Sequence, residues 1–118
     1  MPVEAVVFDL DGVLIDSEPV WREVEARVAE EFGFAYSDEL AVRMHGRGTI
    51  GAGRIIAELT GDEASGLAAS ERMVELMVER GSAGRIPPMP GARELLETLR
   101  GRVRLAVASN SVRRYVEG

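Results

Sequence analysis

The 118-residue sequence contains no cysteine and no lysine. The absence of cysteine excludes disulfides and thiolate metal sites and fits a reducing compartment, so we expect a cytoplasmic protein. All fourteen basic side chains are arginine, and twenty acidic residues leave a formal net charge of −6. This acidic balance argues against nucleic acid or an anionic membrane surface as a partner. No apolar run approaches membrane length, and the N-terminus lacks the pattern of a signal peptide.

Hydrophobic residues make up 46% of the chain, which is enough for a packed core. Two apolar runs, residues 5–9 and 103–108, are typical of strands buried on both faces of a parallel sheet. The segment between them is mostly helical in pattern. We therefore expect an α/β fold in which residues 1–16 and 84–118 form the core. Residues 17–83 would be an inserted, all-helical cap.

Within the expected cap, residues 20–33 place Val20, Val24 and Val28 four apart on one helix face. Ser17 supplies a candidate N-cap for that helix. A longer helix is expected over residues 63–79. Its buried face is expected to contain Leu67, Val74, Met77 and Val78. Residues 81–91 contain three prolines and form the expected hinge back to the core.

The stretch "FDLDGVLIDSE" places Asp9 and Asp11 where the first strand ends. Residues two apart in an extended chain point the same way, and ligands of open α/β sheets bind at the carboxyl ends of strands. Two such carboxylates suit Mg²⁺ shared with a phosphate, and a carboxylate is also a nucleophile toward phosphorus. Gly12 would let a phosphoryl group approach the backbone. The alternative is a solvated Asp-X-Asp-Gly turn.

A calcium loop of the EF-hand type is excluded, because valine stands at two positions, 13 and 20, where that loop needs oxygen ligands. At the end of the second strand lie Ser109 and Asn110, followed by a helix start. A hydroxyl and backbone N–H groups at such a position form an anion site. The alternative is that Ser109 is an ordinary N-cap.

With these residues in view, the chain resembles the haloacid dehalogenase (HAD) superfamily, in the branch with a helical cap. The motifs are "FDLDGVLIDSE", "VASNS" and the re-entry segment "MPGARELLETLR". The resemblance implies a Rossmann-like parallel-sheet core and Mg²⁺ as the cofactor, held by Asp9 and Asp11. It implies that Asp9 is the nucleophile and Asp11 the acid/base, which also offers its backbone carbonyl to the metal. Ser109 would bind phosphate, with help from Asn110.

The sequence departs from that family in one large respect. Family members carry a later lysine and a further acidic pair, whereas this chain has no lysine and reaches only nine residues past Ser109. The resemblance therefore implies the N-terminal portion of an enzyme with an incomplete core. We expect the chain alone to be inactive and to self-associate through its uncovered sheet.

The pattern "GRGTIG", residues 46–51, matches a dinucleotide-binding motif, but it lies in a helical block instead of after a strand. We interpret it as a cap loop that faces the active site, with Gly46 and Arg47 as substrate-contacting candidates, or as a solvated loop. The "DSEPVW" pattern resembles sugar-phosphate phosphatases. The expected function is Mg²⁺-dependent hydrolysis of a small phosphorylated metabolite, such as a sugar or polyol phosphate. The alternatives are a phosphomutase of the same branch and an inactive binding module.

Overall fold

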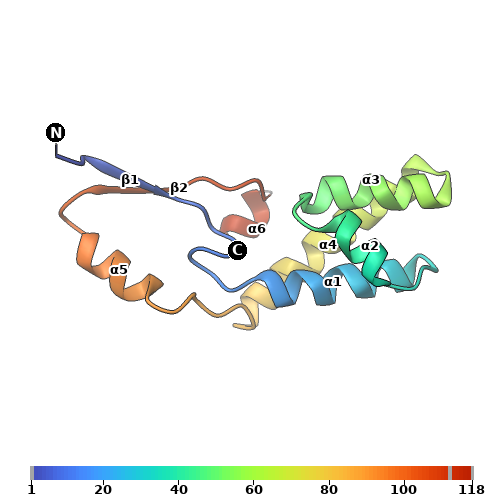
Figure 1. The fold of residues 1–118 in the computed structure, drawn as a ribbon, viewed down its shortest axis with the longest axis horizontal. Helices are drawn as coiled ribbons and strands as arrows, with labels where there is room; N and C mark the ends of the chain where they lie inside the picture. The colour runs from blue at the N-terminus through green and yellow to red at the C-terminus, as the bar shows by residue number, and fades with distance from the viewer. Residues whose placement is uncertain (1, 112, 118) are drawn as a thin grey trace.

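The computed structural model describes residues 2–111 and 113–117, which form a two-stranded sheet and a set of helices (Figure 1). Strand β1 pairs in parallel with β2, in a register that runs from Ala5 opposite Arg104 to Phe8 opposite Val107. Both strands are slightly shorter than predicted. The elements in chain order are β1 Ala5–Phe8, α1 Glu18–Glu31, α2 Asp38–Met44, α3 Gly48–Thr60, α4 Glu63–Ser82, α5 Ala92–Leu99, β2 Arg104–Val107 and α6 Arg113–Glu117.

Helices α1 to α4 gather on one side of the molecule, and the sheet with α5 lies on the other (Figure 1). The two chain segments that join these parts run side by side. The Asp16 N–H donates to the Pro87 carbonyl at 2.8 Å, and the Met89 N–H donates to the Leu14 carbonyl at 2.9 Å. The two connections are therefore tied together directly by backbone hydrogen bonds.

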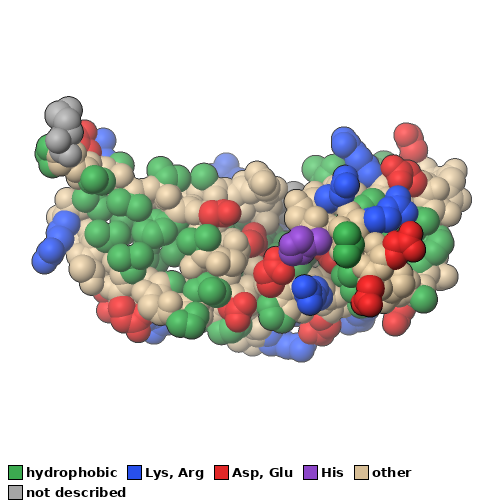
Figure 2. Space-filling view, in the orientation of Figure 1, with side chains coloured by type: hydrophobic (Ala, Val, Ile, Leu, Met, Phe, Trp, Pro, Cys, Tyr) green, Lys and Arg blue, Asp and Glu red, His purple; other side chains and the backbone are tan. Residues whose placement is uncertain are grey.

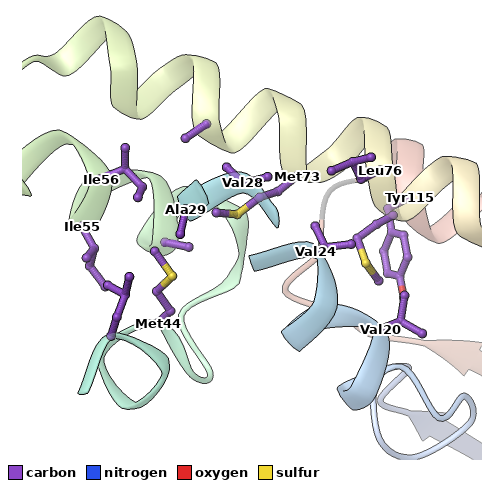
Figure 3. Packing of buried hydrophobic residues seen from close by; sticks show 14 residues of the cluster. Val20, Val24, Val28, Ala29, Met44, Ile55, Ile56, Met73, Leu76 and Tyr115 are labelled. Atoms are coloured by element: carbon purple, nitrogen blue, oxygen red, sulfur yellow. The ribbon is translucent and has the colours of Figure 1, made fainter. Parts of the chain in front are cut away.

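The predicted apolar stripe of α1 is confirmed, because Val24 and Val28 are fully buried and Val20 is nearly so. These side chains pack against Met73 and Leu76 of α4, and residues of α2 and α3 complete the same cluster (Figure 3). Tyr115 of α6 also belongs to this cluster, although it follows β2 in the chain. One aromatic side chain therefore extends from the sheet side into the helical side.

The predicted stripe of α4 is only partly right. Val74 and Met77 are buried, but Leu67 is 74% exposed. The buried face instead passes through Gly66, Ala69 and Met73. Leu67 is one residue out of phase with Gly66 and so is turned about 100° around the helix. Small residues occupy the contact face here because α3 approaches closely.

The glycine-rich segment 46–53 is not a loop throughout, because α3 begins at Gly48. Part of this segment serves helix packing. A Cβ built on Gly53 would collide with the Ser70 hydroxyl and would lie 2.5 Å from the Gly66 carbonyl oxygen. The Ser70 hydroxyl donates to the Thr49 carbonyl at 2.8 Å, which links α4 to α3. The glycines thus set the distance between these two helices.

Gly53→Ala is expected to lower the free energy of unfolding by about 1–3 kcal/mol, as overpacking of a tight core does. The matched control is Gly81→Ala in α4, where the added Cβ would meet only Ile86 Cδ1 at 3.9 Å. That change should be neutral or slightly stabilising, because alanine is the better helix former. Chemical denaturation followed by circular dichroism measures both variants. Equal stabilities would contradict the packing argument.

The prediction that both strands are buried is wrong for the structure described here. Val7 is 63% and Val107 48% exposed. Beside them, a groove of about 670 Å³ runs between the sheet and α5, lined mainly by apolar residues such as Leu14, Leu96 and Leu105. Apolar side chains accordingly dominate this side of the molecule in Figure 2, whereas charged side chains dominate the helical side. A sheet of two strands with one short helix cannot cover both of its own faces.

Among the described residues, no helix is both long enough and apolar enough to cross a membrane.

Candidate active site

Five of the residues singled out in the sequence line one cavity of about 240 Å³, where β1 and β2 end. They are Asp9, Asp11, Gly46, Ser109 and Asn110. The first two come from the end of β1 and the last two from the end of β2, while Gly46 comes from the helical side. Parallel pairing of the two strands explains this convergence, because it brings their carboxyl ends to the same edge. The other lining residues are Glu18, Trp21, Arg22, Glu25, His45, Gly48 and Ser111.

Asp9 directly follows β1, and its side chain is exposed at the cavity. Its Oδ1 accepts a hydrogen bond from the Leu10 N–H at 2.8 Å. A single backbone donor orients this carboxylate but leaves most of its lone pairs directed toward the cavity. That environment suits a group that must reach an incoming phosphorus atom or a cation.

Asp11 has a very different environment, because its carboxylate accepts hydrogen bonds from four side chains. Three donate to Oδ1: Ser17 Oγ at 2.6 Å, Trp21 Nε1 at 3.1 Å and the Tyr115 hydroxyl at 2.9 Å. Oδ2 accepts from Ser111 Oγ at 2.9 Å. Ser17 occupies the predicted N-cap position of α1, but its side chain makes no cap hydrogen bond and is directed to Asp11 instead.

These donors outweigh the effect of burial on Asp11. Burial raises the pKa of its carboxyl, but the hydrogen bonds from Ser17, Trp21, Tyr115 and Ser111 hold that pKa below the usual value. For the Tyr115 hydroxyl, burial and then the adjacent Asp11 carboxylate raise the pKa, so it remains a donor. Asp11 is therefore a carboxylate in this arrangement, and it is held by neutral donors.

Ser109 is arranged to donate a hydrogen bond into the cavity. Its Oγ accepts from the Ser111 N–H at 3.0 Å, which leaves the hydroxyl hydrogen for a further acceptor such as a phosphate oxygen. The expected helper was Asn110, which does line the cavity. The backbone of Ser111 supplies the contact to the Ser109 hydroxyl.

Gly12 and Arg47 are not among the residues that line this cavity. Gly12 has a φ of +76°, which favours glycine, and its N–H donates to the Ile15 carbonyl at 2.9 Å. Its evident role is to turn the chain after Asp11. Arg47 stands at the N-terminus of α3 and lines a separate cavity with Arg54 and Glu58, so the structure does not bring it to Asp9.

The helical side contributes a mixed-charge wall to the cavity through Glu18, Arg22, Glu25 and His45. His45 Nδ1 lies 3.9 Å from a Glu18 carboxylate oxygen. Burial raises the pKa of the Glu25 carboxyl, although the Tyr36 hydroxyl donates to it at 2.6 Å. In Figure 2 the single histidine lies beside acidic and basic side chains near the junction of the two parts.

Among the described residues, no three or more His, Cys, Asp or Glu side chains are grouped to hold a metal ion. Mg²⁺ nevertheless needs only one or two protein carboxylates when it shares phosphate oxygens. The Asp9 carboxylate fits that role. The Asp11 carboxylate does not, because both of its oxygens already accept hydrogen bonds. The residues present therefore fit a cation held by the Asp9 side chain and shared with a phosphate.

Sequence reasoning missed Ser111 and Tyr115 as partners of Asp11. Ser111 and Tyr115 lie 100 and 104 residues beyond Asp11 in the chain. No local pattern marks a serine or tyrosine as the partner of a carboxylate so distant. Only the pairing of β1 with β2 brings these side chains to the same place.

The fold is similar to that of known proteins. One solved structure is that of a HAD hydrolase of family IA, variant 3, from Entamoeba histolytica, which superposes with a TM-score of 0.80. The match covers 98% of this chain and 52% of that chain, at 22% sequence identity. The fold is thus of the HAD class, a Rossmann-like α/β core with a helical cap. A family model for haloacid dehalogenase-like hydrolase matches residues 3–118, and the chain belongs to this family.

Two curated relatives are similar in sequence. The phosphorylated carbohydrates phosphatase of Thermotoga maritima is 34% identical over 113 residues, which are 95% of this chain and 52% of that protein. The (DL)-glycerol-3-phosphatase 1, mitochondrial, of Arabidopsis thaliana is 31% identical over 118 residues, with 95% and 38% covered. The chain therefore spans about half the length, or less, of the curated relatives it matches.

Proposed function

We propose that this chain carries the nucleophile side of a Mg²⁺-dependent phosphatase that acts on a small phosphorylated metabolite such as a sugar or polyol phosphate. The observation that carries the proposal is the convergence of Asp9, Asp11 and Ser109 on one cavity at the ends of two parallel strands. Membership of the hydrolase family and similarity to two proteins named as phosphatases support it. The modest volume of the cavity fits a small substrate.

In the proposed reaction, an Asp9 carboxylate oxygen attacks phosphorus and the bond from phosphorus to the ester oxygen breaks. The leaving alkoxide takes a proton from Asp11, and an aspartyl-phosphate remains on Asp9. Water then attacks that phosphorus and Asp11 takes a proton from the water. The bond from phosphorus to the Asp9 oxygen breaks, which restores the Asp9 carboxylate and releases inorganic phosphate. Ser109 donates a hydrogen bond to a phosphate oxygen throughout both steps.

The role of Asp11 requires a change from the arrangement described here. As a carboxylate it is ready to accept the proton of water. To donate a proton it must first be protonated and turn one oxygen away from its present donors. The acid step therefore follows a rearrangement at the junction of cap and core, where those donors lie. We propose residues 17–83 as the cap that moves in this step.

A bound Mg²⁺, held by the Asp9 carboxylate and the Asp11 main-chain carbonyl, would neutralise part of the phosphate charge. Such neutralisation is needed because Asp9, Asp11, Glu18 and Glu25 all line the cavity. Without a cation, these acidic groups would repel a phosphate ester.

The mixed charge of the cavity wall on the helical side favours hydrolysis over a phosphomutase reaction, in which the phosphate returns to another position of the substrate. A phosphomutase must hold a second phosphate group on the cap side while the first is transferred. Of the lining residues there, Arg22 is cationic and His45 can become so, but Glu18 and Glu25 lie in the same wall. Arg47, which could have added positive charge, lines another cavity.

The proposal is tested on the native gene product, after its mass is measured, with Mg²⁺ and a panel of glycerol, hexose and aryl phosphates. Release of inorganic phosphate, lost on chelation of the metal, is the expected result. If no inorganic phosphate is released and the phosphate instead moves to another hydroxyl of the substrate, the protein is a phosphomutase. The 118-residue chain alone is proposed to be inactive, because it offers no lysine to offset phosphate charge. Turnover by that chain alone would contradict this part of the proposal.

A further inference from the structure

Asp11 accepts hydrogen bonds from two parts of the fold, the helical side and the segment that follows β2. Ser17 and Trp21 reach it from the start of α1, on the helical side. Ser111 and Tyr115 reach it from the segment that follows β2. No other carboxylate among the described residues accepts hydrogen bonds from so many separate elements. Movement of α1 relative to α6 must therefore break or change contacts to this one side chain.

Trp21 and Tyr115 also contact each other. Their ring centroids lie 5.5 Å apart with an interplanar angle of 63°, an edge-on arrangement that aromatic pairs favour. The indole N–H and the tyrosine hydroxyl both donate to the same oxygen of Asp11, Oδ1. Tyr115 is only 7% exposed and packs in the hydrophobic cluster of the helical side (Figure 3). The two rings therefore pack against each other, and the polar group of each ring donates to Asp11.

Packing alone would not require the indole N–H of Trp21 or the hydroxyl of Tyr115. Phenylalanine would fill much of the same space at either position, without any donor. Buried Trp and Tyr usually find some acceptor, but here both find the same carboxylate oxygen, next to the proposed nucleophile Asp9. None of the ion pairs among the described residues involves Asp11, so its donors are uncharged and fix its direction without neutralising it.

We propose that Trp21 and Tyr115 are positioning residues for Asp11, and that they set its orientation according to the placement of α1 against α6. This inference rests on the proposed phosphatase function for its kinetic consequence. Tyr115 does not line the cavity, and Trp21, which does, directs its only polar group at Asp11. Their loss is therefore expected to lower the rate of the chemical steps, in which Asp11 exchanges protons, and to leave substrate binding largely unchanged.

Tyr115→Phe is the sharpest variant, because it removes one hydroxyl and keeps the ring that packs in the cluster. In the native gene product kcat is expected to fall roughly 10- to 100-fold, the effect of one lost hydrogen bond to a charged group, with KM within about twofold. Trp21→Phe should act in the same way. Thr98→Val is the control for the kinetics, because it removes a hydroxyl that donates to the Glu94 carbonyl in α5 at 2.8 Å, outside the cavity.

A spectroscopic measurement tests the hydrogen bond from Trp21 to Asp11 and does not depend on enzymatic activity. Trp21 is the only tryptophan in this chain, so the indole N–H band in ultraviolet resonance Raman spectra of the 118 residues reports on one hydrogen bond. Tyr115→Phe removes a competing donor to Oδ1 and should shift the band toward a stronger hydrogen bond. Asp11→Ala should shift it the opposite way, and Tyr36→Phe should leave it in place.

The two measurements separate the possible failures. A band that Asp11→Ala and Tyr115→Phe leave unmoved would overturn the positioning proposal. A rise in KM at constant kcat would also overturn it, because that pattern indicates a binding role. Shifted bands in the 118-residue chain, together with a native gene product that hydrolyses no phosphate ester, would support the hydrogen-bond arrangement and overturn the proposed function.

Discussion

Replacing Asp9 with Asn in the native gene product is expected to abolish both phosphate release and the formation of a covalent phosphoprotein. An amide is a far weaker nucleophile than a carboxylate, and it brings no negative charge to a cation. Nothing else at the end of β1 could take over, because the Asp11 oxygens are engaged by four donors. Acid quenching during turnover, followed by intact mass measurement, detects the aspartyl-phosphate.

The control for this change is Asp38→Asn, which makes the same substitution at the exposed start of α2. That side chain does not line the cavity, and the variant should form the phosphoprotein at the normal rate. Substantial turnover by the Asp9→Asn protein would remove Asp9 from the nucleophilic role. Loss of the intermediate in the Asp38→Asn protein would instead indicate a general effect of lost charge.

The two aspartates illustrate how one short motif produces two kinds of carboxylate. Asp9 directly follows strand β1, is exposed, and accepts one hydrogen bond from the Leu10 N–H. Asp11, two residues later, enters a turn closed by Gly12 and accepts hydrogen bonds from two further segments, the start of α1 and the segment after β2. A lightly held carboxylate suits attack on phosphorus, and a firmly held one suits proton transfer at a fixed position.

Much of this site was predictable because it depends on local pattern. An apolar run that ends in two aspartates marks a strand whose carboxyl end presents them, and a second such run ends in Ser109. Parallel pairing then brings the two strand ends together with no further assumption. The valine spacing of α1 likewise predicted the face that is buried.

The parts that failed depend on contacts between distant segments. Leu67 looked buried from its own helix, but the close approach of α3 gave the contact face to Gly66 and its neighbours. Ser17 stands at the N-cap position of α1, but its side chain accepts no cap hydrogen bond and its hydroxyl donates to the charged Asp11 carboxylate. The burial of β1 was predicted for a sheet covered on both faces, and the two-stranded sheet here has no such cover.

That uncovered sheet leads to the second large expected effect. The 118-residue chain should elute as a dimer or larger species, well above its monomer mass of 12.8 kDa. Among the residues that the structure describes, strand β1 pairs only with β2. Val7 and Val107 expose apolar surface beside an apolar groove. Parallel strands persist when covered, and an open strand edge offers unpaired N–H and C=O groups to another chain. Size-exclusion chromatography with light scattering measures the mass in solution.

A pair of variants locates the surface responsible. Val7→Lys places a charge on the exposed strand β1, where Val7 stands opposite Ala106, and should shift the chain toward the monomer. Val42→Lys is the matched control, because this valine is 77% exposed on α2 of the helical side, away from the sheet. It should leave the association unchanged. A monomeric wild-type chain would show that the sheet face is stable when open. Dissociation by Val42→Lys alone would place the contact on the helical side, because a charge there can disrupt only an interface that includes α2.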